Sequence, residues 1–135
     1  MKIDGMWYIS KRTDYTINNG KLYVSSHDEL LTALQKLVID KQPDDSFVIL
    51  PKNGSIIVDT HDVILCHPFE LLERNGFTEV ERIPLGGIRR YDNRTEVRFI
   101  AKFKKGNITV TFTINSIDFG TYSFDKVEQV TVRRE

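Results

Sequence analysis

Two neighbouring runs of alternating apolar and polar side chains constrain the fold of this chain more than any other feature. In residues 94–104, Val97, Phe99, Ala101 and Phe103 alternate with Arg94, Glu96, Arg98, Ile100, Lys102 and Lys104. Successive side chains of a β-strand point to opposite faces, so this pattern predicts a strand with one buried face and one solvated face. The next run repeats the pattern, with apolar Ile108, Val110, Phe112 and Ile114 alternating with Asn107, Thr109, Thr111 and Thr113.

The short connection between these runs predicts an antiparallel hairpin. A two-residue turn at Lys105-Gly106 would pair Phe103 with Ile108 and Phe99 with Phe112 on the buried face. The same register would place Lys102 beside Thr109 and Arg98 beside Thr113 on the solvated face. The predicted hairpin therefore has an apolar underside and a basic, hydroxyl-rich top.

The rest of the chain predicts more hairpins and two helices. Asn18-Asn19-Gly20-Lys21 between Tyr15–Ile17 and Leu22–Val24 indicates a tight turn between two strands, and residues 47–50 and 56–58 flank a similar turn. Ser26 followed by Glu29 is a capping box, and leucines at helical spacing predict a helix over about 27–41. A second helix is predicted over about 68–74, ending at Asn75-Gly76. The expected fold class is α+β, an antiparallel, hairpin-rich sheet with one long and one short helix packed on it, in a single domain over 1–135.

Composition excludes several classes of protein. The chain has 135 residues, 40% hydrophobic and 28% charged, which is ordinary for a globular domain that builds its own core. Cys66 is the single cysteine, so the chain has no internal disulfide framework. No apolar run has the length of a membrane span, and the first residues lack a signal-peptide core. We therefore expect a soluble cytoplasmic protein without a membrane partner.

Charge is unevenly distributed along a chain whose net charge is zero. Residues 26–79 hold ten acidic and four basic side chains, whereas residues 80–105 hold eight basic and three acidic ones. The basic stretch predicts a binding site for an anionic partner, which is nucleic acid, a nucleotide-like ligand or an acidic protein surface. In this interpretation arginines contact phosphate or carboxylate, lysines add positive potential, and an aromatic ring stacks. The predicted ligand-binding residues are Arg89, Arg90, Tyr91, Arg94, Arg98, Lys102, Lys104 and Lys105. A solvated sheet face that binds nothing has the same composition.

Two other function classes remain open from the sequence. Ile100, apolar on the solvated face, indicates that a helix, a partner or a second copy covers it. An interaction or inhibitor protein, such as an accessory protein of a virus or mobile element, and a homodimer around Ile100 are therefore alternatives. An enzyme using Cys66, His61 and Asp59 is the third class, because thiol, imidazole and carboxylate are nucleophile, base and metal-ligand types. No nucleophile elbow, phosphate-binding loop or paired metal-ligand motif occurs, so no catalytic residue, cofactor or metal is assigned.

Overall fold

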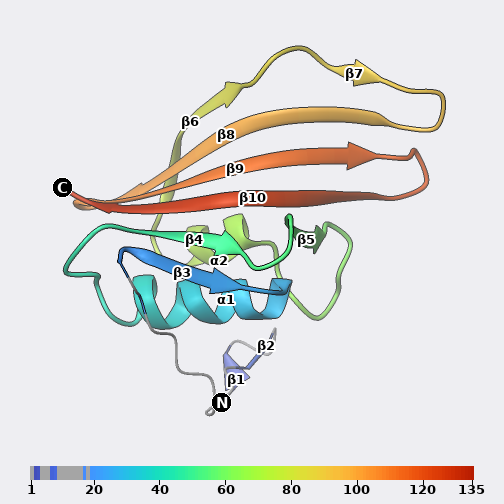
Figure 1. Ribbon diagram of the computed structural model, residues 1–135. Helices are drawn as coiled ribbons and strands as arrows, with labels where there is room; N and C mark the ends of the chain where they lie inside the picture. Colours follow the sequence, from blue (N-terminus) through green and yellow to red (C-terminus); the bar gives the residue numbers. More distant parts are fainter. Residues whose placement is uncertain (1, 4–6, 9–16, 18) are drawn as a thin grey trace.

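The computed structural model describes residues 2–3, 7–8, 17 and 19–135, and these form an α+β fold (Figure 1). An eight-stranded sheet has the order β3-β4-β10-β9-β8-β6, with β5 added beside β10 and β7 beside β8. Two short strands near the N-terminus, β1 (Lys2–Ile3) and β2 (Trp7–Tyr8), pair with each other. The main-sheet strands are β3 (Lys21–Val24), β4 (Phe47–Pro51), β5 (Ile56–Asp59), β6 (Thr78–Pro84), β7 (Arg89–Arg90), β8 (Thr95–Lys105), β9 (Ile108–Asp118) and β10 (Ser123–Arg134).

The alternating runs form the long antiparallel pair β8–β9, as predicted, but their register differs from the prediction by two residues. Phe103 pairs with Val110, and Lys105 pairs with Ile108, so the turn is Gly106-Asn107. Gly106 has a φ of 60°, which favours glycine at the first central position of a tight hairpin turn. Because side chains alternate with a period of two, this shift leaves every residue on its predicted face.

The C-terminal strand β10 is a single strand of 12 residues that pairs along β9. A register shift between Val127 and Gln129 marks a bulge at Glu128. Val127 before the bulge and Val130 and Val132 after it all point into the core and are fully buried. The extra residue at the bulge makes this possible, because without it Val127 and Val130 would point to opposite faces.

The segment over 47–58 does not form the predicted hairpin. Val132 and Val130 of β10 pair with β4, and Val127 and Phe124 of the same strand pair with β5. Strands β4 and β5 thus follow one another along a single edge of β10, and residues 52–55 loop out between them. The reason is that the length of β10 provides pairing positions for both segments in the same direction.

The sequence predicted an antiparallel sheet, but the observed sheet is mixed. Strand β3 pairs in parallel with β4, with Leu22 opposite Ile49. The chain between these strands forms a helix, and such a crossover is what parallel neighbours require. Asn19 and Gly20 before β3 both have positive φ, the geometry expected of the Asn-Gly turn. The predicted partner strand was Tyr15–Ile17, of which Tyr15 and Thr16 lie outside the described residues.

The first helix is shorter than the predicted 27–41. Helix α1 spans His27–Leu34, and a π-helical turn, η1, continues it over Gln35–Ile39. Ser26 Oγ accepts the Glu29 N–H at 3.1 Å, and the Glu29 carboxylate accepts the Ser25 N–H at 2.7 Å, so the predicted cap forms. At the other end the Asp40 N–H donates to the Gln35 carbonyl, and Gln35 Nε2 donates to Asp40 Oδ1 at 2.6 Å. This paired i to i+5 contact favours the wider turn over the α-helical one.

Helix α2 (Pro68–Arg74) matches the prediction over 68–74. It ends before Gly76, whose φ of 92° provides the left-handed cap. Both helices pack on the same face of the sheet, here called the inner face (Figure 1), and their leucines join the buried strand residues in one core cluster. The opposite, outer face carries Arg98, Ile100 and Lys102 of β8. Within the described residues, no helix combines the length and apolar content needed to cross a membrane.

Candidate functional site

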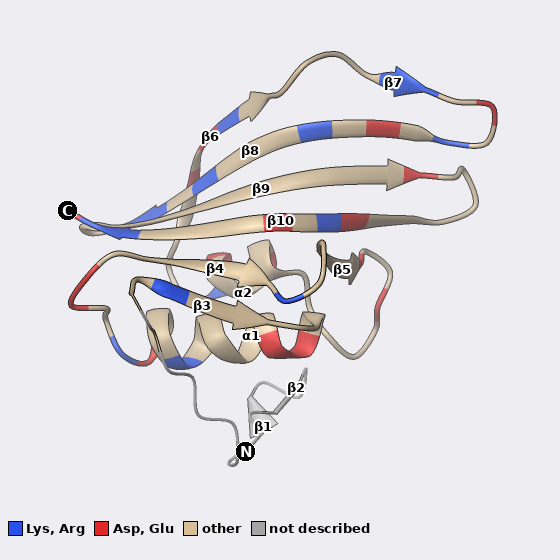
Figure 2. Ribbon diagram, viewed as in Figure 1, with Lys and Arg blue, Asp and Glu red and all other residues tan. Residues whose placement is uncertain are grey.

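The outer face of β8, β9 and β10 brings part of the predicted basic site together. The register aligns Lys102 with Thr111, and Lys104 with Thr109, so lysines and threonine hydroxyls lie side by side on this face. Figure 2 shows Lys and Arg positions on β7, along β8 and at the C-terminal end of β10. This arrangement has the polar donors that phosphate and carboxylate groups require.

Carboxylates from other strands pair with several of these cations. Arg98 donates to Glu128 of β10 at 3.0 and 2.8 Å, and Lys102 lies 3.4 Å from Glu81 of β6. The hydrogen bonds that Arg98 donates to Glu128 raise the pKa of the Arg98 guanidinium further above its ordinary value. These exposed pairs are screened by solvent and contribute little to stability, but they reduce the positive potential that a ligand would meet.

A second ion-pair network lies at the far end of β8. Glu96 accepts from Arg94 Nε at 2.6 Å and from Asn115 Nδ2 at 3.1 Å, and it lies 3.4 Å from Arg89. The hydrogen bond from Arg94, followed by that from Asn115, lowers the pKa of the Glu96 carboxyl, which holds it charged. Glu96 therefore serves as the shared counter-ion of two arginines that the sequence assigned to a ligand.

The remaining predicted residues are not gathered on the outer face. Tyr91 is 47% exposed, but the Arg94 guanidinium lies 4.2 Å from the centre of its ring, so one ring face is covered. Lys105 points to the inner side, where its Nζ donates to the Asn75 carbonyl at 2.8 Å. Arg90 is exposed on the short strand β7, and its pairing position opposite Thr95 places it on the inner side of the sheet.

The structure adds Arg133, which the sequence analysis missed. Lys104, Thr109 and Arg133 form one cross-strand row on the outer face, since Thr109 pairs with Lys104 on one side and Arg133 on the other. Both cations are exposed, and neither has a carboxylate partner in the described part of the chain. Thr109 Oγ1 donates to the Glu135 carboxylate at 3.1 Å, so Glu135 places a negative charge beside this row. Alternation along residues 127–133 could have predicted that Arg133 is exposed. Only the register of β10 against β9 shows that it lies beside Thr109.

A groove on the inner face is a second candidate site, and sequence reasoning did not find it. It lies where β8–β10 extend beyond α2, with Phe99, Ser116 and Asp125 on the sheet and His67 and Phe69 at the start of α2. Its volume is about 410 Å³. A neighbouring hollow of about 490 Å³ shares Arg82, Phe99 and Ser116 with it, so the two lie side by side. We call this combined hollow the inner groove.

His67 and Asp125 form the best-defined polar contact of the inner groove. His67 Nε2 lies 2.7 Å from Asp125 Oδ2, and the Phe69 N–H donates to His67 Nδ1 at 3.1 Å. Because Nδ1 accepts, the proton of the neutral ring is assigned to Nε2, which donates to Asp125. Both ring nitrogens are engaged, so His67 orients Asp125 and caps α2 and has no free nitrogen for proton transfer.

The residues proposed for an enzyme are dispersed by their local roles. Cys66 is 4% exposed and belongs to the core cluster, and its carbonyl lies 2.9 Å from His27 Nε2. Asp59 Oδ1 accepts the His61 N–H at 2.9 Å within its own turn, and the His61 side chain is exposed. Within the described residues, no group of three His, Cys, Asp or Glu side chains is placed to hold a metal ion.

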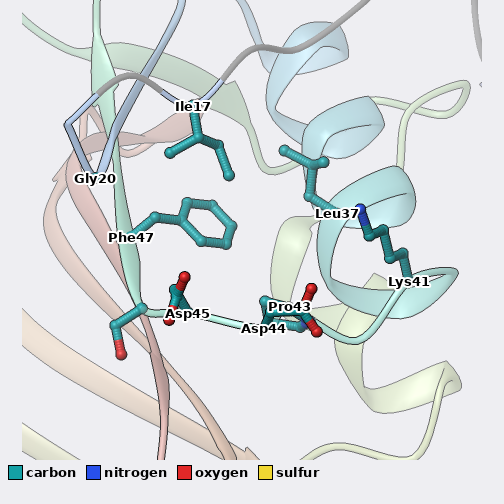
Figure 3. Close-up of a pocket in the computed structure, with 9 residues that line it drawn as sticks. Ile17, Gly20, Leu37, Lys41, Pro43, Asp44, Asp45 and Phe47 are labelled. Carbon is teal, nitrogen blue, oxygen red and sulfur yellow. The ribbon is translucent and has the colours of Figure 1, made fainter.

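A third hollow of about 380 Å³ lies between the end of η1 and β4 (Figure 3). Ile17, Leu37 and Phe47 point into it, and Asp44 and Asp45 lie at its rim. Its carboxylates oppose an anionic ligand, so this hollow does not extend the predicted basic site. Comparisons with protein-family models, with curated proteins and with solved structures return no match to this chain.

Proposed function

We propose that this protein is a non-catalytic binding protein that holds the phosphate backbone of nucleic acid on the outer face of β8–β10. The observation that carries the proposal is the row Lys104–Thr109–Arg133, in which two exposed cations flank a hydroxyl. Neither cation has a carboxylate partner among the described residues. Lysine, arginine and threonine side chains are the groups that most often contact phosphate oxygens.

The neighbouring residues extend the same chemistry along the strands. Lys102 and Thr111 form the next row, two residues from the first, with Thr131 of β10 completing it. Strand geometry separates such rows by roughly 7 Å, so a flexible polyanion can contact both rows at once. Arg98 joins this surface when a ligand phosphate competes with Glu128, because that pair is exposed and exchangeable.

The experiment is a titration of a fluorescently labelled single-stranded oligothymidylate at several salt concentrations. The double variant Lys104→Gln/Arg133→Gln removes the unpartnered cations, and Lys41→Gln/Lys52→Gln removes the same charge from exposed positions outside β8–β10. We expect the first variant to bind more weakly and to reduce the slope of log affinity against log salt by about 1.4, or about 0.7 per lost phosphate contact. The second variant should keep the wild-type slope.

Equal affinity of the two variants would refute the proposal, as would the absence of binding at low salt. A nucleoside triphosphate and a polyglutamate peptide, titrated in parallel, represent the other predicted anionic partners. If either of these ligands binds more tightly than the oligonucleotide, that ligand class, and not nucleic acid, is the partner. Dimerisation around Ile100 stays a separate prediction. The structure places Ile100 on the outer face opposite Ile83 of β6, and both are half-buried.

A further inference from the structure

We propose that the inner groove binds a small organic cation, an ammonium or guanidinium group carried on a short carbon chain. The groove lies on the face of the sheet opposite the basic rows, so this proposal does not depend on the proposed function. It rests on the placement of Asp125, on two aromatic rings and on the balance of charge around the hollow.

The first support is the geometry of the hollow. Strands β8–β10 extend beyond the helices at one end of the sheet (Figure 1), and the hollow lies on the inner face there, lined by Phe99, Ser116 and Asp125. Val97 and Phe99 of β8 line it together with Phe69 of α2, and Pro84 of β6, which pairs with Phe99, also lines it, so its lining is largely apolar. Concave sites with an apolar floor and a few convergent polar groups are the usual form of small-molecule sites.

The second support is the Asp125 carboxylate. Asp125 is 7% exposed and lines the groove, and its Oδ2 is held by His67 at 2.7 Å. Its Oδ1 has no hydrogen-bond partner among the described residues, although it is not sealed from the groove. A nearly buried carboxylate oxygen that keeps a fixed orientation and lacks a donor is a site for a charged donor from outside.

The third support is that two aromatic rings lining the groove, Phe69 and Phe99, already attract a cation of this chain. The Arg82 guanidinium lies 4.9 Å from the centre of the Phe99 ring and 5.6 Å from that of Phe69. These distances are within the range of cation–π attraction. Arg82 is held at this rim by two hydrogen bonds to Glu79, at 2.7 and 3.0 Å, so its own charge is offset.

The balance of charge gives the sign of the ligand. Asp125, Glu70 and Glu73 line the groove, and Arg82 is the cation among the lining residues. Glu70 is paired with Arg74 at 3.0 Å, and Arg82 with Glu79. Among the described residues, Glu73 and Asp125, which has one oxygen held by His67, are therefore the lining carboxylates without a lysine or arginine partner. An anion would therefore be repelled, whereas a cation would meet a carboxylate at one end and aromatic faces along its chain.

The test uses agmatine, which carries a guanidinium and an ammonium group on four carbons, and butyrate as the anion of similar length. Both are titrated into the wild-type protein while NMR follows the ring signals of Phe69 and Phe99 and the Ser116 amide. We expect agmatine to shift these signals saturably and butyrate to leave them in place. Asp125→Asn keeps an acceptor for His67 and should weaken agmatine binding about tenfold, the loss of one hydrogen bond to a charged group. Asp92→Asn, an exposed change of the same kind in the turn before β8, should not alter it.

Three outcomes would overturn the proposal. These are an absence of agmatine shifts at the groove residues, butyrate shifts equal to those of agmatine, and equal affinity in Asp125→Asn and the wild type. The agmatine and butyrate comparison needs no variant, so it decides the proposal even where Asp125→Asn does not fold. Oligothymidylate binding by the outer face can fail or succeed without changing any of these readouts.

Discussion

Replacing His67 by alanine should destabilise the protein by about 2–4 kcal/mol. The substitution removes two contacts at once, the acceptor for the Phe69 N–H and the donor for Asp125. Loss of a helix N-cap costs about 1 kcal/mol. Leaving a buried acceptor without its donor costs about 1–3 kcal/mol, and Asp125 is only 7% exposed. Water that enters from the inner groove would place the cost at the low end of this range.

Two further substitutions separate the two contributions. His67→Asn keeps a side-chain oxygen that accepts the Phe69 N–H but is too short to reach Asp125, so it should lose only about 1–3 kcal/mol. Asp125→Asn keeps an acceptor for His67 Nε2 and removes a nearly buried charge, so its effect should be smaller than that of His67→Ala.

Urea unfolding followed by circular dichroism measures all three variants against the wild type. The expected order of destabilisation places His67→Ala first and His67→Asn second. A His67→Ala protein within about 0.5 kcal/mol of the wild type, the range of ordinary surface substitutions, would refute the reasoning. That result would mean that the imidazole bridge between α2 and β10 adds nothing that water does not supply.

Two other predictions concern His27 and the β8–β9 turn. Burial lowers the pKa of His27 below its ordinary 6.5, so below pH 6.5 the unfolded chain binds a proton that the folded protein does not. The free energy of unfolding should therefore fall as pH decreases from 6.5, and His27→Gln should show a shallower fall in urea titrations; equal slopes would contradict the assignment. Gly106→Ala, at a φ of 60°, should lose about 1 kcal/mol in thermal unfolding, whereas Gly87→Ala, in open space and without a positive φ, should lose little; equal losses would exclude backbone strain as the cause.

The alternation of residues 94–114 predicted which side chains are buried, and this held although the register was wrong by two residues. Phe103, Val110 and Phe112 are fully buried, and Lys104 is exposed. A period of two is a local property of the strand backbone, so it does not depend on which residue lies opposite. The turn position depends on which residues take the central conformations, and a choice between Lys105-Gly106 and Gly106-Asn107 needs the paired strands.

In the helices, too, local features were predicted correctly and features that depend on other contacts were missed. Ser26 and Glu29 predicted the start of α1, because a cap involves residues within one turn. The end of α1 was missed, because the contact of Gln35 with Asp40 favours a π-helical turn that leucine spacing does not reveal. The parallel pairing of β3 with β4 was missed as well, since two segments that each read as half of a hairpin were joined instead through a helix.

The sequence by itself determined the strand faces, the helix caps and the gathering of cations in residues 89–105, because each follows from spacing along a few neighbouring residues. The tertiary structure decided which of those cations are neutralised, since Glu81 and Glu128 reach them from other strands. It also decided that Arg133 joins Lys104, and that Asp125, His67 and Phe99 line one groove. These contacts join residues that are roughly 20 to 60 positions apart in the chain, and no local periodicity contains that information.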